Sequence, residues 1–493
     1  MFKFCACAAA AVLIIAPSAH AIDFNFYGRS GDAIEINLAA LPGVATGSTF
    51  SGLDLSGFAG HTVLTGDTLT GQAFSTFGRF WLFPNPARNT PALGDINSSA
   101  RGFQGVLNGS VLISGVNKSF SIKVQPGYTG SGFGAVGQSS ERIGDATNNP
   151  LFVAQQQQRL RYLGFVRQGG AAIAVDGDFG PATDEATRTF QGAFVGGYNT
   201  TQADVDGIIG PNTAGWLNAR NAPIWGELID PDPQPAGTFS ISRMIGSFDI
   251  YPGGDRSGTT PQPERFGTSW TFNLIEKGSA IAKAATGRTQ RINAISRSDG
   301  YGSSAAHSTH RVGMDIDLGT DSSTWNWGDG VTSSEEQKVI THAISFVNAG
   351  ASGRVIRFIT SNQDIYDGIH AASPSTALYY DTSGDHQNHL HIDIGPPTRI
   401  AGLANLAGDF NLDDVVDARD YLLWLEGLGA TYRHADYNLW RANFGRANAA
   451  DAAAMAVPEP AAGICVLTAI LTSLGTMRRH HHRFNPRPAE LVA

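Results

Sequence analysis

The chain has 493 residues, a formal net charge of −9 and only 16% charged residues. This length predicts several domains, and the weakly charged, acidic composition argues against nucleic acid as a partner. Of the three cysteines, Cys5 and Cys7 lie in an N-terminal apolar segment and Cys465 lies in a C-terminal one. The body of the chain therefore contains neither a disulfide nor a thiolate metal site.

Residues 1–21 have the pattern of a secretory signal peptide. Lys3 supplies the positive start, an apolar run follows, and Ala19 and Ala21 are the small residues that precede a cleavage site. We expect cleavage after Ala21 and an exported protein, either periplasmic or held at the cell surface.

Residues 22–149 are rich in Gly, Ser, Thr and Phe and poor in charge. Within them, Ser110–Ser114 and Ser119–Val124 flank Gly-Val-Asn-Lys, which predicts a β-hairpin. We expect a β-rich N-terminal module. A carbohydrate-binding, an adhesive and a spacer role all agree with this composition.

Residues 150–221 contain the motif Val-Asp-Gly-x-x-Gly-Pro-x-Thr twice, starting at Val175 and at Val205. Each copy predicts a glycine-rich turn followed by a helix with proline in its first turn. The pattern resembles the small peptidoglycan-binding domain of cell-wall hydrolases, which implies an all-α fold and peptidoglycan as a partner. The alternative for Asp176 and Asp206 is that they only cap turns.

Residues 222–238 include the run Ile-Asp-Pro-Asp-Pro-Gln-Pro-Ala, which predicts a semi-rigid Pro-rich linker. The following segment, 239–400, mixes helix and strand patterns without a regular βαβ alternation, so we expect an α+β fold. The expected helices are Leu274–Ala285 and Ser333–Asn348, the second with a capping box, and the expected strands include Arg291–Ser296 and Val355–Thr360.

Two stretches of this segment alternate apolar and polar residues, which is the period of a β-strand. Met314–Leu318 places two aspartates on one face, and His389–Ile394 places two histidines and an aspartate on one face. If the strands are neighbours, they present a polar cluster on a buried sheet. Burying unpaired carboxylates is costly, and a divalent cation would offset that cost.

His310 lies seven residues before Asp317, and Gly313 between them allows the chain to bend back towards the strand. Two neutral imidazoles and one carboxylate suit zinc and leave a fourth position for water. The residues alone therefore indicate a zinc site that is divided between distant parts of the chain.

The motif His-x-x-His-x-x-Gly-x-Asp-x-Asp, and His-x-x-His-x-His far downstream, resemble the penicillin-insensitive murein endopeptidases. These belong to a wider group of zinc peptidases that includes D-Ala-D-Ala dipeptidases and carboxypeptidases. The resemblance covers the segment from Phe239 to Pro397. It implies that His310, Asp317 and His391 bind zinc, with His307 at a further histidine position of the endopeptidases.

The resemblance also implies which groups transfer protons. Many relatives carry a carboxylate three residues before the last ligand, but here that position is Asn388, so His386 or His389 is the expected general base. Arg297, with Arg311 as its rival, corresponds to an arginine that polarises the scissile carbonyl. The alternatives are histidines that only stabilise a core, and a pseudo-enzyme without metal.

Residues 404–447 place oxygen-bearing side chains at calcium-loop spacing. The loop ends in Asp, and a second Asp-Tyr-x-x-Trp repeat follows, so this small helical module resembles a dockerin. The resemblance implies Ca²⁺ and a cohesin-like partner, whereas the alternative is a plain acidic helix start. The expected ligands are Asp409, Asn411, Asp413, Asp417 and Asp420.

Residues 457–484 begin with Val-Pro-Glu-Pro, continue with seventeen uncharged residues and end in a basic run. The apolar length is at the short end for a membrane span, and the basic residues hold the tail inside. This three-part pattern resembles the PEP-CTERM sorting tail, which implies processing by an exosortase and attachment to the membrane.

These patterns predict a multidomain, exported zinc peptidase that hydrolyses cross-link or stem-peptide bonds of peptidoglycan. A murein endopeptidase is the first hypothesis. The alternatives are a D,D- or L,D-carboxypeptidase, a protease of ordinary proteins, and a wall-binding scaffold without catalysis.

Overall fold

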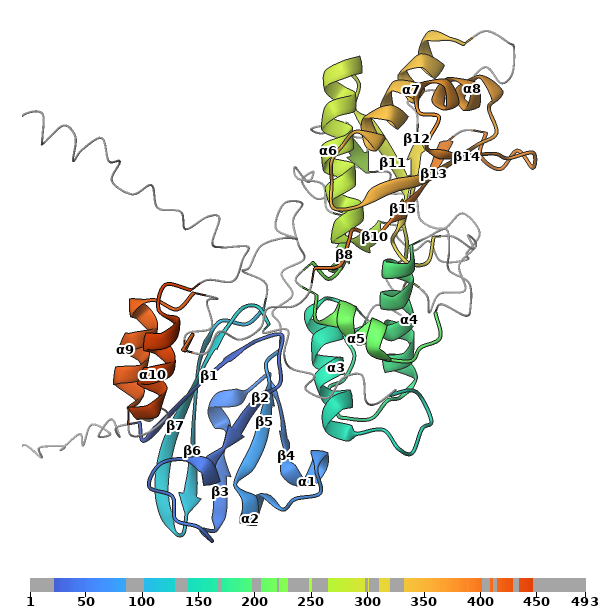
Figure 1. Ribbon diagram of the computed structural model, residues 1–493. Coiled ribbons are helices and arrows are strands. Elements are labelled where there is room, and N and C mark those ends of the chain that lie inside the picture. The colour runs from blue at the N-terminus through green and yellow to red at the C-terminus, as the bar shows by residue number, and fades with distance from the viewer. Residues whose placement is uncertain are drawn as a thin grey trace, which may run out of the picture.

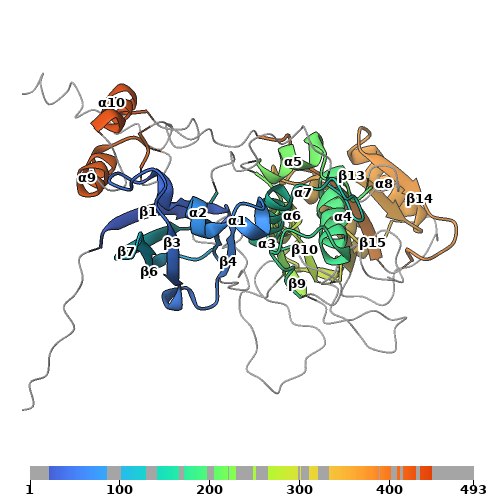
Figure 2. The ribbon, with the colours of Figure 1, turned by 90° about the horizontal axis from the view of Figure 1, so that it is seen from below.

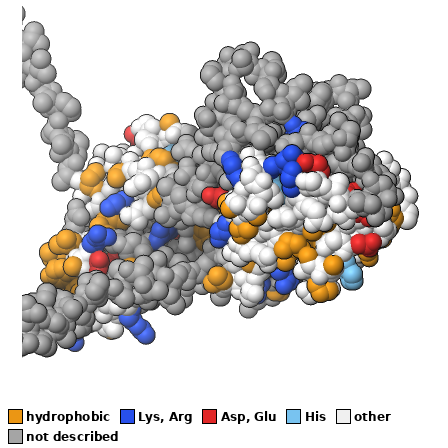
Figure 3. All heavy atoms as spheres, turned by 90° about the horizontal axis from the view of Figure 1, so that it is seen from above, with side chains coloured by type: hydrophobic (Ala, Val, Ile, Leu, Met, Phe, Trp, Pro, Cys, Tyr) orange, Lys and Arg blue, Asp and Glu red, His pale blue; other side chains and the backbone are white. Residues whose placement is uncertain are grey.

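The computed structural model describes residues 22–85, 102–128, 141–165, 171–196, 205–219, 221–228, 248–250, 265–297, 300, 310–319, 332–387, 389–400, 408–410, 415–428 and 434–446. The predicted signal segment and sorting tail lie outside these residues, as do His307 and Asn388. Among the described helices, none is long and apolar enough to cross a membrane. On the face drawn in Figure 3, basic and acidic side chains are interspersed rather than separated by sign.

The N-terminal strands form two sheets over one apolar core (Figure 1). The strands are β1 (Phe24–Arg29), β2 (Ile34–Asn37), β3 (Phe50–Asp54), β4 (Thr62–Thr65), β5 (Arg79–Phe83), β6 (Gly105–Ile113) and β7 (Val116–Gln125). The sheet orders are β1-β7-β6-β3 and β2-β5-β4. Phe80 of one sheet and Phe120 of the other meet in the core, with ring centroids 5.8 Å apart. Short helices α1 (Gly66–Leu69) and α2 (Phe74–Phe77) precede β5.

The predicted β-hairpin is present, but its loop differs from the expectation. β6 and β7 are antiparallel, and Ile113 pairs directly with Val116. The turn is Ser114-Gly115, with φ angles of 48° and 81°. The expected four-residue loop Gly-Val-Asn-Lys is therefore wrong, because two left-handed residues are enough to reverse a twisted pair of strands.

The two sequence repeats form equivalent turns between α3 (Pro150–Tyr162), α4 (Pro181–Val195) and α5 (Pro211–Leu217). Gln157 Nε2 donates to Oδ1 of Asp176 at 2.9 Å, and Gln191 Nε2 donates to Oδ1 of Asp206 at 2.7 Å. Each glutamine oxygen accepts the N–H of the glycine that follows the aspartate. The two aspartates thus hold turns, as the structural alternative expects.

A mixed six-stranded sheet follows, in the order β14-β13-β15-β12-β11-β9, beside the two-stranded pair β10-β8. Helices α6, α7 and α8 pack on one face of the large sheet. On that face, Ile316, Leu318 and Ile392 of the sheet form one apolar cluster with buried side chains of the helices. The elements are β8 (Trp225–Glu227), β9 (Phe248–Ile250), β10 (Phe266–Thr268), α6 (Ser269–Thr286), β11 (Gln290–Ala294), β12 (Asp315–Gly319), α7 (Ser334–Val347), β13 (Arg354–Thr360), α8 (Gln363–Ala372), β14 (Ala377–Tyr380) and β15 (His389–Gly395).

Local signals placed several of these elements well. The capping box that begins α7 is present between Ser333 and Glu336, and the alternating stretches form β12 and β15, which are direct antiparallel neighbours. α6 begins five residues before the expected Leu274, because Thr268 caps it by accepting the N–H of Thr271.

The segment expected to be a linker, 222–238, enters the fold in its first residues. β8 pairs with β10, Trp225 N donates to Leu163 O at 2.8 Å, and the Trp225 ring lies 5.7 Å from that of Phe165. A large aromatic side chain gains free energy when it is buried, whereas the proline-rich pattern begins only after β8. Residues 222–228 therefore belong to the packed structure rather than to a linker.

Two further helices, α9 (Ala418–Gly427) and α10 (His434–Asn443), lie towards the C-terminus. The aromatic residues of the repeat pack between them, with ring centroids 5.0 Å apart for Tyr421 and Trp440 and 5.1 Å apart for Trp424 and Tyr437. The dockerin-like identity of this pair and the division of the chain into domains stay predictions.

Candidate metal centre

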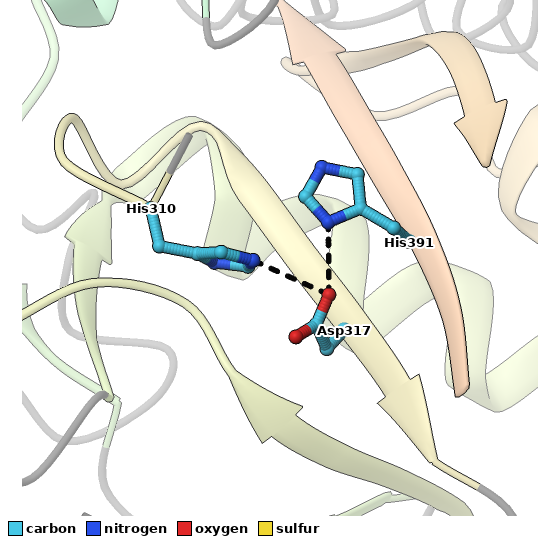
Figure 4. Close-up of side chains that lie close together, drawn as sticks. All are labelled: His310, Asp317 and His391. Atoms are coloured by element: carbon cyan, nitrogen blue, oxygen red, sulfur yellow. Dashed lines mark hydrogen bonds and ion pairs between the residues drawn. The ribbon is translucent and has the colours of Figure 1, made fainter. Parts of the chain in front are cut away.

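Two buried histidines, His310 from a loop and His391 from β15, converge on one carboxylate oxygen of Asp317 on β12 (Figure 4). Nε2 of His310 lies 3.3 Å from Oδ1 of Asp317, and Nδ1 of His391 lies 2.9 Å from the same oxygen. The ligand atoms of the three residues all lie within 4.8 Å of one another. The structure thus brings together the three residues that the sequence proposes as zinc ligands.

The backbone explains this convergence. The β12–β15 register pairs Asp317 directly with His391, and directly paired residues of antiparallel strands have side chains on the same face. Gly313 turns the preceding loop with a φ of 65°, and a Cβ there would lie 2.4 Å from Cα of Gly267. Only glycine fits this bend, which returns His310 to the strand.

Each imidazole is oriented by a polar contact of its second ring nitrogen. Nδ1 of His310 donates to the carbonyl of Ile295 at 2.7 Å, which turns Nε2 towards Asp317. Nε2 of His391 lies 3.2 Å from Oδ1 of Asp393, which leaves Nδ1 turned towards Asp317. Contacts of this kind fix the tautomer and ring orientation of metal-binding histidines.

The sequence patterns did not reveal the arginine that pairs with Asp393. Nε of Arg357, from β13, pairs with Oδ2 of the buried Asp393, so the negative charge of Asp393 has a partner inside the fold. The alternation of β15 placed Asp393 on the polar face, but no local signal connects it with an arginine far earlier in the chain.

The charges of the cluster suit a cation. Burial opposes a charge on His391, yet hydrogen bonds with Asp317 and Asp393 outweigh burial and raise the pKa of His391 to about 10. Burial also opposes the charge of Asp317, but His310 and His389 keep the pKa of Asp317 well below its usual range. In the absence of an ion, the proton on His391 balances the negative charge of Asp317, and a metal ion would replace that proton.

The distances also fit zinc. Ligand atoms roughly 2.0–2.2 Å from a tetrahedral zinc ion are about 3.4 Å from one another. The 3.3 Å between His310 and Asp317 matches this separation, whereas the 2.9 Å between His391 and Asp317 is a hydrogen-bond distance that would lengthen when an ion enters. A second set, Asp315, His391 and Asp393, is similarly close. Because burial raises the pKa of Asp315 well above its usual value, we assign this set to support of the His391 ring.

Both proposed proton-transfer histidines lie beside the centre. Nε2 of His389 is 3.6 Å from Oδ1 of Asp317, and burial lowers the pKa of His389 to about 4, so its ring is neutral at pH 7. The His386 ring lies 5.1 Å from that of His389 and 5.6 Å from that of His391. Nδ1 of His386 is 2.9 Å from Oδ2 of Asp381, which orients it.

The two candidate arginines flank the ligand loop. Arg297 is half-buried and lies two residues after Ile295. The carbonyl of Ile295 accepts the hydrogen bond from His310. Arg311 is the residue after His310. The chain therefore brings both to the His310 side of the centre, and the role of either in polarising a carbonyl stays a prediction.

The predicted calcium ligands lie in a separate region. Asn411 and Asp413 fall outside the described residues. Oδ1 of Asp420 accepts the N–H of Phe410 and Oδ2 accepts that of Asp417, both at 2.8 Å. Asp417 and Asp420 form a capping box at the start of α9, which agrees with the alternative of an acidic helix start. Calcium binding by Asp409, Asp417 and Asp420 stays a prediction.

Comparison with known proteins points to the same chemistry. No protein-family model matches the chain. The chain is similar to a zinc D-Ala-D-Ala carboxypeptidase of Streptomyces albus G, with 28% identity over 198 residues. The match covers 40% of this chain and 64% of the relative, which is less than two thirds of that protein's length.

Proposed function

We propose that this protein is a zinc-dependent peptidase of peptidoglycan. The observation that carries the proposal is the shared contact of His310 and His391 with one oxygen of Asp317. The similarity to a zinc D-Ala-D-Ala carboxypeptidase supports the same metal and the same class of substrate. A core that only needed stability would not require three ionisable groups within reach of one point, because burying them is costly.

The residues around the centre have distinct tasks in this proposal. Zinc, when bound, supplies a Lewis acid that activates water and the scissile carbonyl. His389 is neutral and near Asp317, so it can accept a proton. His386 is held by Asp381 and can deliver a proton to the leaving amine. Either histidine can be the base, and Arg297 is proposed to polarise the carbonyl.

The scissile bond has two candidates. The histidine-rich motifs favour a murein endopeptidase that cuts cross-links, and the relative favours a carboxypeptidase that trims stem peptides. Digestion of purified muropeptides separates them. Conversion of cross-linked dimers to monomers identifies an endopeptidase, whereas loss of only a terminal residue identifies a carboxypeptidase. A zinc-loaded protein that releases no product from either substrate would be a scaffold.

The other segments fit delivery of this catalyst to the wall. We propose that residues 150–221 bind peptidoglycan, and that residues 1–21 and 457–484 direct export, exosortase-type processing and attachment to the membrane. A cohesin-like partner and Ca²⁺ at 404–447 complete the proposal. Calorimetry with Ca²⁺ on the full chain tests the last point, and no binding heat would favour the acidic helix start.

The zinc proposal is tested by the His310→Ala variant. We expect it to lose bound zinc and to digest purified peptidoglycan at least about 100-fold more slowly, because one of three protein ligands is gone. Zinc content is measured by atomic absorption, and digestion by release of soluble muropeptides with and without a chelator.

The matched control is His370→Ala, which removes an exposed histidine of α8 that stacks on Tyr366. This variant should keep both zinc and activity. Digestion that survives in His310→Ala, or in the wild-type protein after complete removal of metal, would refute zinc catalysis.

A further inference from the structure

One exposed aromatic residue lies on the same face of the sheet as the metal centre. Tyr379 of β14 is 53% exposed. The register pairs Tyr379 with Ile359, Ile359 with His391, and His391 with Asp317. Directly paired residues share a face of the sheet, so these four side chains form one row across four strands that ends at the candidate zinc ligands.

The neighbouring residue confirms this orientation independently. Successive side chains of a strand point to opposite faces, and the ring of Tyr380 lies 5.9 Å from that of Tyr366 on α8. Helix α8 packs with α7 behind the sheet, where Ile365 and Ile369 are buried. Tyr379 therefore faces the side of the sheet that carries His391.

The row has the character of a binding surface. Ile359 is 7% exposed and gives an apolar floor between Tyr379 and His391. Tyr379 lies on the outermost strand of the sheet, a position where charged side chains usually protect the edge. A large exposed aromatic at such an edge, in line with a candidate active centre, offers area that a ligand can bury.

The spacing sets which part of a substrate would reach this residue. Strands are separated by roughly 4.8 Å, so two spacings place Tyr379 about 10 Å from His391. An extended peptide advances about 3.3 Å per residue. About three residues of a peptide that is cleaved at the centre would span this distance.

We propose that Tyr379 forms a subsite that binds the stem peptide at about the third residue from the cleaved bond. This inference rests on the proposed function and adds a specificity-determining residue to it. The ring would pack on the peptide chain, and such an aromatic contact is worth about 1 kcal/mol, or roughly five- to tenfold in affinity.

The test compares Tyr379→Ala with the wild-type protein on synthetic stem-peptide fragments. The fragments end either one or three residues from the cleaved bond, on its amino side and on its carboxyl side. We expect the variant to lose about five- to tenfold in kcat/KM, mainly through KM, on the long fragments of one side. The short fragments and the zinc content should be unaffected.

Two control variants accompany it. Tyr379→Phe keeps the ring and should keep the wild-type kcat/KM. Ile281→Ala removes an exposed apolar side chain of α6 (39% exposed), away from the row, and should also behave as the wild type. Equal kcat/KM for Tyr379→Ala and wild type on every fragment would overturn the subsite, and so would an equal loss on short and long fragments.

Failure of the proposed function gives a different result. A wild-type protein that binds zinc but cleaves no fragment would refute the peptidase. The subsite is then measured by calorimetric binding of the long fragments to the wild type and to Tyr379→Ala. A five- to tenfold weaker affinity of the variant supports the subsite, and equal affinities refute it.

Discussion

The helical segment of α3, α4 and α5 meets its two neighbours in different ways. Figures 1 and 2 show α3 between the N-terminal sheets and α4. Towards the six-stranded sheet the contact is a continuous apolar core, whereas towards the N-terminal sheets it combines a small apolar cluster with buried polar contacts. We call these the apolar junction (Phe165, Trp216, Trp225, Trp270) and the polar junction (Asp32, Tyr128, Gln158, Arg159).

The apolar junction merges two predicted domains into one unit. Trp216 of α5 and Trp270 of α6 have ring centroids 5.3 Å apart, and both belong to the cluster that contains the sheet core. The contact also extends towards the ligand loop, because a Cβ on Gly300 would lie 2.4 Å from Cγ2 of Thr189. The helical segment thus packs against Gly300, which also lies close to the carbonyl oxygen of Arg311.

The polar junction depends on directional contacts. Nη2 of the buried Arg159 is 2.6 Å from Oδ1 of Asp32, and Nε donates to the carbonyl of Gly31 at 3.0 Å. Gln158 Nε2 donates to the carbonyls of Ser30 and Pro84 at 2.6 and 2.7 Å. Five buried apolar residues lie beside these contacts: Leu69, Trp81, Phe83, Ala154 and Val175.

The difference indicates what each junction does. Apolar burial is non-directional and roughly proportional to area, so the apolar junction supplies stability. A buried ion pair adds little net stability because of desolvation, but it penalises any arrangement that separates its partners. We therefore expect the polar junction to fix the orientation of the N-terminal module, and the apolar junction to make the helical segment and the six-stranded sheet unfold together.

The largest effect should follow from Trp216→Ala. The change leaves a cavity in the shared core, and substitutions of this kind cost about 3–5 kcal/mol. We expect one lowered urea midpoint for both the helical segment and the six-stranded sheet, and weaker retention of zinc at the candidate centre. The measurement is denaturation followed by circular dichroism and by zinc release.

The control for this change is Leu422→Ala, which shortens a side chain of α9 that is 61% exposed and should shift the midpoint little. If Trp216→Ala destabilised the helical segment while zinc release kept its wild-type midpoint, the shared core would not be a single cooperative unit.

A smaller effect is expected from Asp32→Asn at the polar junction. Arg159 would lose its partner while still buried, which costs about 3 kcal/mol. The double variant Asp32→Asn/Arg159→Met should recover most of that stability, because the unpaired charge is gone. Thermal unfolding of the single and double variants gives the coupling energy. A double variant no more stable than the single one would show that the pair supplies stability itself.

The smallest effect should come from Tyr128→Phe. The Tyr128 hydroxyl donates to the carbonyl of Ala219, and its ring lies 3.8 Å from the guanidinium carbon of Arg159. Removing only the hydroxyl costs about 1 kcal/mol and keeps the ring contact. A loss as large as that of Asp32→Asn would mean that this hydrogen bond, rather than the ion pair, holds the junction.

Much of the candidate site could be predicted because its signals are local. The alternation at Met314–Leu318 and at His389–Ile394 identified two strands, and the glycine before the first explains the return of His310. Arg357 and Asp381 could not be found in this way. Each acts on a site residue through a contact between different strands or loops, and spacing along the chain carries no information about such contacts.

The sequence by itself determined which side chains the candidate centre contains, the repeat turns and the capping of α7, since each is written in a short local pattern of residues. Only the tertiary structure decided that β12 and β15 are neighbours, that Tyr379 shares a row with His391, and that Trp225 belongs to a core instead of a linker. These outcomes depend on strand register and on the packing of apolar side chains from distant segments. Both are settled by the free energy of the whole fold rather than by local preference.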